Sequence, residues 1–162
     1  MKPFLLSEKV KAEIDSWVEK YPLDQKRSAV IPALHIVQQA NEGWLSEAAM
    51  EAVADYLSLP VIAVFEVATF YSMFNLSPVG RHQISICTNL SCMLKGSDKV
   101  YRHLQDKLGI SFKETTPDGK FTLKEVECLA ACAGAPACMV DKTYYEHLTP
   151  EKLNEILADL DK

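Results

Sequence analysis

The cysteines are the residues of this chain whose types and spacing could support chemistry. Four of the five fall in two close pairs, with four residues between Cys87 and Cys92, three between Cys128 and Cys132, and 35 between the pairs. Two loops that bring four thiolates together can complete the coordination of a metal centre, and all-cysteine ligation is typical of zinc and of iron-sulfur clusters. The spacing therefore predicts a metal centre held by these four sulfurs.

The gaps within the pairs distinguish zinc from iron only in part. Structural zinc sites usually place two to four residues between paired cysteines, often two, so these gaps are permitted but not typical. A gap of four residues occurs in known ferredoxins, and a 2Fe-2S centre needs two thiolates for each iron. No histidine lies within two residues of the four cysteines, so mixed histidine and cysteine ligation has no local support. Iron-sulfur is modestly favoured, and zinc stays open.

Two interpretations of the cysteines need no metal. A thioredoxin-type redox dithiol normally uses a CxxC motif, which this chain lacks. Free cysteines also fill cores as small apolar side chains, although two close pairs at the ends of predicted strands argue against that role for all four. Cys138 is different, since it begins the apolar segment CMV beyond Gly134 and Pro136. We expect Cys138 to pack in the core without binding metal.

The residues around the predicted ligands could adjust such a centre. With four thiolates and two sulfides, an oxidised 2Fe-2S centre is formally a dianion and the reduced one a trianion, so nearby charges and hydrogen bonds to sulfur set its potential. Thr88, Asn89 and Ser91 offer backbone amides beside the first pair. Lys95 and Lys124 are candidate charges, although an ordinary solvated lysine is the simpler interpretation of each.

Helices separated by stop signals are predicted for roughly the first 70 residues. Apolar residues recur at helical spacing from a predicted N-cap at Ser7 until Pro22, and a second stripe ends near Gly43. A third helix is predicted after Ser46, and Pro60 opens a fourth that runs through VIAVFEVATFYSMF. We expect a small helical bundle with most of its aromatic side chains in the core.

One part of this bundle has a second interpretation. Phe70, Tyr71 and Phe74 could instead be partly exposed and form a contact for a partner subunit.

The pattern changes after NLSPVGR. HQISICT alternates apolar and polar residues and predicts a strand that ends at Cys87. Ser97 is the predicted N-cap of a helix closed by Gly109. A turn in PDGK leads to a strand that delivers Cys128, ACMVD and TYYEH are two more short strands, and a last helix begins after Thr149 as N-cap. The sequence predicts an α+β protein with a helical bundle over residues 1–78 and a mixed domain over residues 79–162.

The composition excludes several functional classes. The 162 residues are 48% apolar and 24% charged, which is ordinary for a folded globular protein. A formal net charge of -5 without a Lys/Arg cluster argues against nucleic-acid binding. A run of only three apolar residues precedes Glu8 and no apolar run approaches a membrane span, so we expect a cytoplasmic protein without direct membrane insertion.

Motifs for nucleotide binding and for catalysis are also missing from the sequence. The six glycines form no GxGxxG and no P-loop, so nothing indicates that this chain holds a nucleotide or a flavin. No nucleophile elbow or HExxH motif is present either. We therefore expect a carrier of single electrons that depends on a partner, with no complete active site of its own.

Several segments together resemble a known family. GWLSEAAMEAVADYLSLP and VFEVATFYSMF, followed by CTNLSC, TTPDGKFTLKEVECLAAC and GAPACMVDKTYYEHLTPEKL, are similar to the small 2Fe-2S subunit of bacterial NADH:quinone oxidoreductase, respiratory complex I. The resemblance covers nearly the whole chain. It implies a helical bundle followed by a thioredoxin-like 2Fe-2S ferredoxin domain, with one cluster on Cys87, Cys92, Cys128 and Cys132.

The resemblance also implies partners. In that family the subunit lies against a larger flavoprotein subunit, which binds FMN and NADH, and it belongs to the peripheral arm of a complex at the inner membrane. Related subunits in NAD-linked hydrogenases and formate dehydrogenases share the cysteine pattern, and a zinc-stabilised interaction module is the alternative of another class. The chain departs from the family pattern at Ala130, where glycine is frequent, and at Cys138.

Overall fold

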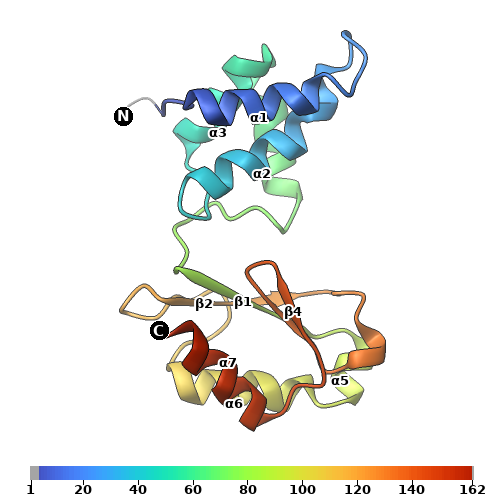
Figure 1. The fold of residues 1–162 in the computed structure, drawn as a ribbon, viewed down its shortest axis with the longest axis vertical. Helices are drawn as coiled ribbons and strands as arrows, with labels where there is room; N and C mark the ends of the chain where they lie inside the picture. The colour runs from blue at the N-terminus through green and yellow to red at the C-terminus, as the bar shows by residue number, and fades with distance from the viewer. Residues whose placement is uncertain (1–3, 162) are drawn as a thin grey trace. The chain divides into compact units, whose positions relative to one another are not determined.

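The computed structural model describes residues 4–161, and the chain divides into two compact units between Pro78 and Val79. The first unit is helical and the second combines helices with one sheet (Figure 1), which confirms the predicted α+β class. The elements of the first unit are α1 (Glu8–Val18), the 3-10 turn η1 (Lys26–Ala29), α2 (Val30–Ala40), α3 (Glu47–Leu57) and α4 (Val61–Phe70).

Two helices of the first unit begin at the predicted caps. The Ser7 hydroxyl accepts a hydrogen bond from the Val10 amide at 3.3 Å, and the Ser46 hydroxyl accepts one from the Ala49 amide at 3.2 Å. Each cap satisfies an amide that the first helical turn leaves without a partner. The four helices then close around one apolar core, whose largest fully buried side chains are Ile14, Val30, Leu34, Val37, Leu45, Val53 and Val64.

The prediction that the aromatic side chains of this unit lie in the core is wrong for three of them. Helix α4 ends at Phe70, before YSMF, because the backbone turns extended at Tyr71 and the Phe74 amide then closes a turn on the Tyr71 carbonyl at 3.1 Å. Phe70 is 79% exposed and Tyr71 38%, in line with the second interpretation of this segment, whereas Phe74 is buried, as the first one predicts. Trp17 is 39% exposed and lies under the Lys20 ammonium, 3.5 Å from the ring centroid.

The second unit contains a four-stranded sheet in the order β2-β1-β3-β4. Its elements are β1 (His82–Cys87), α5 (Leu90–Leu94), α6 (Ser97–Leu108), β2 (Phe121–Val126), the 3-10 turn η2 (Cys132–Gly134), β3 (Cys138–Val140), β4 (Thr143–Tyr145) and α7 (Pro150–Leu160). Strands β1 and β2 are parallel, with Cys87 beside Val126, and β3 runs antiparallel to β1. The ends of β1 and β2 and the start of β3 therefore meet at one edge of the sheet.

Helices α6 and α7 pack together beside the sheet (Figure 1). Helix α7 begins as predicted, with the Thr149 hydroxyl accepting from the Lys152 amide at 3.3 Å and Pro150 in the first turn. The largest fully buried side chains between these layers are Ile84, Ile86, Leu104, Leu123 and Leu153. Along the whole described stretch, 4–161, none of the helices combines the length and the apolar character needed to cross a bilayer.

The start of α6 differs from the prediction. Gly96, not Ser97, is the cap, and Ser97 is a buried first residue of the helix without a capping hydrogen bond from its side chain. The reason is the short helix α5, which the sequence pattern did not predict. Gly96 has a φ of 97°, a conformation that glycine adopts without strain, and so joins α5 directly to α6.

Candidate metal centre

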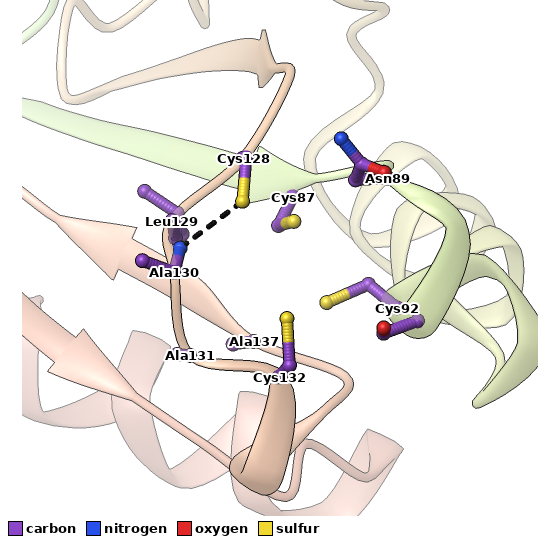
Figure 2. A pocket seen from close by; sticks show the side chains of 10 residues that line it. Cys87, Asn89, Cys92, Cys128, Leu129, Ala130, Ala131, Cys132 and Ala137 are labelled. Atoms are coloured by element: carbon purple, nitrogen blue, oxygen red, sulfur yellow. Dashed lines mark hydrogen bonds between the residues drawn. The ribbon is translucent and has the colours of Figure 1, made fainter.

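The two cysteine pairs converge at the edge of the sheet where β1 and β2 end. Cys87 is the last residue of β1 and Cys92 lies in α5, while Cys128 follows β2 by two residues and Cys132 opens η2. All four line one cavity of about 80 Å³. Figure 2 shows their sulfur atoms directed toward a common space, from segments that are far apart in the sequence.

The cavity has a buried side and an exposed side. Cys87 and Cys92 are 4% and 3% exposed, whereas Cys128 and Cys132 are solvent-exposed. The remaining wall consists of Asn89, Ser91, Leu129, Ala130, Ala131 and Ala137. Because most of these side chains are small, the backbone itself approaches the sulfurs. Asn89 also caps α5, its side-chain oxygen accepting from the Leu90 amide at 2.7 Å.

Backbone amides favour negative charge on the sulfurs. The Ala130 amide donates to Cys128 Sγ at 3.2 Å, the dashed line in Figure 2. Burial raises the pKa of the Cys87 thiol, but hydrogen bonds from the Asn89 and Leu129 amides and from neighbouring thiols outweigh it and leave this pKa below its ordinary value. Burial, with the Cys87 thiolate beside it, raises the pKa of Cys92. A cation bound between these thiols would favour both thiolates.

The arrangement of the donors suits a two-iron cluster. Among residues 4–161, no group of three or more His, Cys, Asp or Glu side chains is close enough to hold a single metal ion. The four thiols instead surround a cavity, and a 2Fe-2S rhomb needs thiolates on both of its sides rather than at one point. Four sulfur donors around one cavity are the donor set that this cluster takes.

A comparison with protein families decides the family. The model of the thioredoxin-like [2Fe-2S] ferredoxin family matches residues 14–161. The chain belongs to this family. The resemblance seen in the sequence is thereby confirmed, as is the thioredoxin-like fold of the second unit.

Two curated relatives extend the comparison. A subunit of the NADH-quinone oxidoreductase of Rickettsia bellii is 48% identical over 143 residues, which are 88% of this chain and 86% of the relative. The mitochondrial NADH dehydrogenase [ubiquinone] flavoprotein 2 of Dictyostelium discoideum is 41% identical over 158 residues, 98% of this chain and 64% of the relative.

A solved structure supports the fold alone. A chain of an NAD+-reducing [NiFe]-hydrogenase in its air-oxidized state matches with a TM-score of 0.68 at 21% identity, over 79% of this chain and 22% of that chain.

Ala130, where the family pattern often has glycine, occupies a position that favours glycine. Its φ is 56°, in the left-handed region, and its amide is the donor to Cys128 Sγ. A Cβ in this region costs about 1–2 kcal/mol. The loop therefore keeps a geometry that aims the amide at sulfur, at the expense of backbone strain at Ala130.

We expect Ala130→Gly to stabilise the protein by about 0.5–1 kcal/mol, because relief of the strain exceeds the added freedom of the unfolded chain. The unfolding midpoint should rise by a few degrees in a thermal scan. Ala133→Gly is the matched control, since Ala133 has no positive φ and should lose stability. A lower thermal unfolding midpoint for Ala130→Gly than for the native protein would contradict the backbone strain inferred at Ala130.

Cys138 lies apart from the other four thiols. It is fully buried in the core of the second unit, as predicted, and is not among the residues that line the cavity. In the sheet it pairs with Ile86 on β1 and with Tyr145 on β4. Burial raises the pKa of Cys138 to about 12, although the nearby positive charge of Lys152 acts in the opposite direction.

Cys138 should accordingly resist alkylation in the native protein. Only the thiolate is nucleophilic, and a thiol with a pKa of about 12 is almost entirely protonated at neutral or mildly alkaline pH. Iodoacetamide at mildly alkaline pH, followed by peptide mass mapping, should leave Cys138 unmodified until denaturant is added. Rapid labelling of Cys138 before denaturation would show that this part of the sheet opens.

The two predicted tuning lysines do not line the cavity. Lys95 is exposed, and Lys124 is half-buried in β2, where burial lowers its pKa. The sequence pattern did not indicate the short helix that carries Cys92 or the contribution of Leu129, Ala131 and Ala137 to the wall. Only the small size of the residues between and after the cysteines hinted at such a close approach of the backbone.

Proposed function

We propose that this chain is an electron-transfer subunit of an NADH:quinone oxidoreductase and carries one 2Fe-2S cluster on Cys87, Cys92, Cys128 and Cys132. The observation that carries the proposal is the convergence of these four thiols on a single cavity. Membership of the thioredoxin-like [2Fe-2S] ferredoxin family supports the kind of cluster, and the names of the curated relatives support the kind of complex.

The cysteines on the buried and on the exposed side of the cavity have different roles in this proposal. When bound, the cluster accepts and donates single electrons. Cys87 and Cys92 bind from the buried side, where little water reaches the sulfurs. The exposed Cys128 and Cys132 lie on the side that a redox partner can approach most closely. The Ala130 amide favours negative charge on Cys128 Sγ and thus the more reduced state.

The partner in this proposal is a flavoprotein subunit that binds FMN and NADH, together with other subunits of a peripheral arm. This chain lacks a GxGxxG motif and a P-loop, so the nucleotide chemistry belongs to the partner. The chain then acts as a non-catalytic carrier, in the cytoplasm and at the inner membrane only through its complex.

A second candidate is the equivalent diaphorase subunit of an NAD-linked hydrogenase or formate dehydrogenase. The sequence resemblance supports it, because related subunits in such complexes share the cysteine pattern. The subunits that co-purify with the chain from its own cell distinguish the two, since quinone-reductase subunits support the first candidate and hydrogenase or formate dehydrogenase subunits the second.

Reduction by NADH tests the carrier role. The purified chain alone should not be reduced by NADH, whereas the complex with the flavin-bearing subunit should give the paramagnetic signal of the reduced cluster within the mixing time. Direct reduction of the isolated chain by NADH, or no reduction in the complex, would contradict the proposed division of labour.

A further inference from the structure

Glu146 lies against the loop that carries Cys132. Gly134, the last residue of η2, is buried, and the Glu146 side chain occupies the space beside it where another residue would have its Cβ. A Cβ built on Gly134 would lie 2.6 Å from the Cβ of Glu146 and closer still to its carboxyl group. The carboxyl group is therefore seated on the backbone of the same 3-10 turn that begins with Cys132.

The main chain holds Glu146 in this position. The amide of the next residue, His147, donates to the Gly134 carbonyl at 2.6 Å, and the Leu148 amide donates to the Pro136 carbonyl at 3.0 Å. These bonds join the segment after β4 to the segment before β3. A movement of the Glu146 main chain away from the turn would break them.

The carboxylate of Glu146 is not part of a salt bridge within residues 4–161. The Lys152 ammonium approaches Glu146 but donates to its main-chain carbonyl, at 2.6 Å. A fixed negative charge one short turn from a ligand opposes the gain of a further negative charge, and solvent exposure weakens that effect without removing it.

We propose that Glu146 is a positioning residue that lowers the reduction potential of the metal centre, because it holds a carboxylate on the turn that bears Cys132. The inference rests on the proposed function, since it concerns the potential of the cluster assigned there. It also explains why residue 134 is a glycine, because the side chain of any larger residue would displace the carboxylate of Glu146.

The test is a redox titration of the full-length chain with its cluster, followed by EPR. Glu146→Gln should raise the midpoint potential. At a fixed applied potential the ratio of reduced to oxidised protein should rise about threefold, which corresponds to a shift in midpoint potential of roughly 28 mV for a one-electron couple. Glu146→Asp, which keeps the charge, should stay closer to the native value. Asp106→Asn is the matched control, because Asp106 is an exposed carboxylate far from the cysteines. It lies in the last turn of α6, and this turn is beside Lys120 and Phe121 at the start of β2, whereas the cysteines lie beyond the end of that strand.

A double-mutant cycle tests whether the contact with Gly134 is what holds the Glu146 carboxylate in place. Gly134→Ala should push the carboxylate aside and raise the potential, and should add little to Glu146→Gln when the two are combined. A normal EPR signal with equal potentials for Glu146→Gln and Asp106→Asn would overturn this inference alone, as would fully additive shifts. Absence of any iron-sulfur signal in the native protein would instead overturn the proposed function, and this inference would fall with it.

Discussion

Cys128→Ala should yield a protein without a 2Fe-2S cluster. Cys128 follows β2 and its sulfur faces the common cavity, so its removal leaves one iron with a single protein thiolate. We expect loss of the brown colour and a fall in bound iron by at least tenfold in protein purified without oxygen. Cys87→Ala should behave in the same way, since Cys87 supplies a thiol from the buried side.

Cys138→Ala is the matched control for these variants. It removes a thiol from the same unit, at a position that is buried but outside the cavity. The lost packing should cost about 1 kcal/mol of stability, and the iron content should remain that of the native protein. Full iron occupancy in Cys128→Ala, or loss of iron in Cys138→Ala alone, would show that the ligands are assigned wrongly.

Leu104→Ala should destabilise the second unit by about 3 kcal/mol. Leu104 is fully buried in α6, within the core that supports the sheet, so the shorter side chain leaves a cavity where packing was complete. Thermal loss of the visible absorption of the cluster should occur at least about 10 °C lower than in the native protein.

Leu94→Ala provides the comparison, because Leu94 is 74% exposed on α5 and should change stability by less than about 0.5 kcal/mol. Trp17 and Trp44 both lie in the first unit, so their fluorescence reports on that unit within the same sample. Their transition should move less than the loss of absorption. Equal midpoints for Leu104→Ala and Leu94→Ala would mean that α6 does not support the core as described.

Local signals in the sequence were sufficient where one side chain and one neighbouring amide decide the structure. Ser7, Ser46 and Thr149 each cap the helix predicted to follow them. The limits of β1 are also those predicted, although its burial does not alternate, since the polar Ser85 is buried along with Ile84, Ile86 and Cys87. Such signals act over a few residues and need no knowledge of the tertiary fold.

Features that depend on tertiary contacts were not predictable. Ser97 looks like a cap, but α5 precedes it and Gly96 takes that place. The sequence left open whether Phe70 and Tyr71 are buried or exposed, and they are exposed because the end of α4 is set by the chain that follows it. The pairing of the cysteines suggested a metal centre, yet its buried and exposed sides follow from the sheet order.

The contact between Glu146 and Gly134 joins residues twelve positions apart, and no local pattern marks it. At Ala130 the glycine that is frequent in the family marks the position in the sequence, but its positive φ is set by the three-dimensional loop.

Metal and sulfide analysis of the anaerobically purified protein, with absorption and EPR spectra before and after dithionite, tests the assignment of a 2Fe-2S cluster most directly. We expect a brown protein with about two irons and two sulfides per chain and an S = 1/2 signal that appears only on reduction. A colourless protein with stoichiometric zinc, no sulfide and no signal would contradict this assignment, and the four cysteines would then form a structural zinc site.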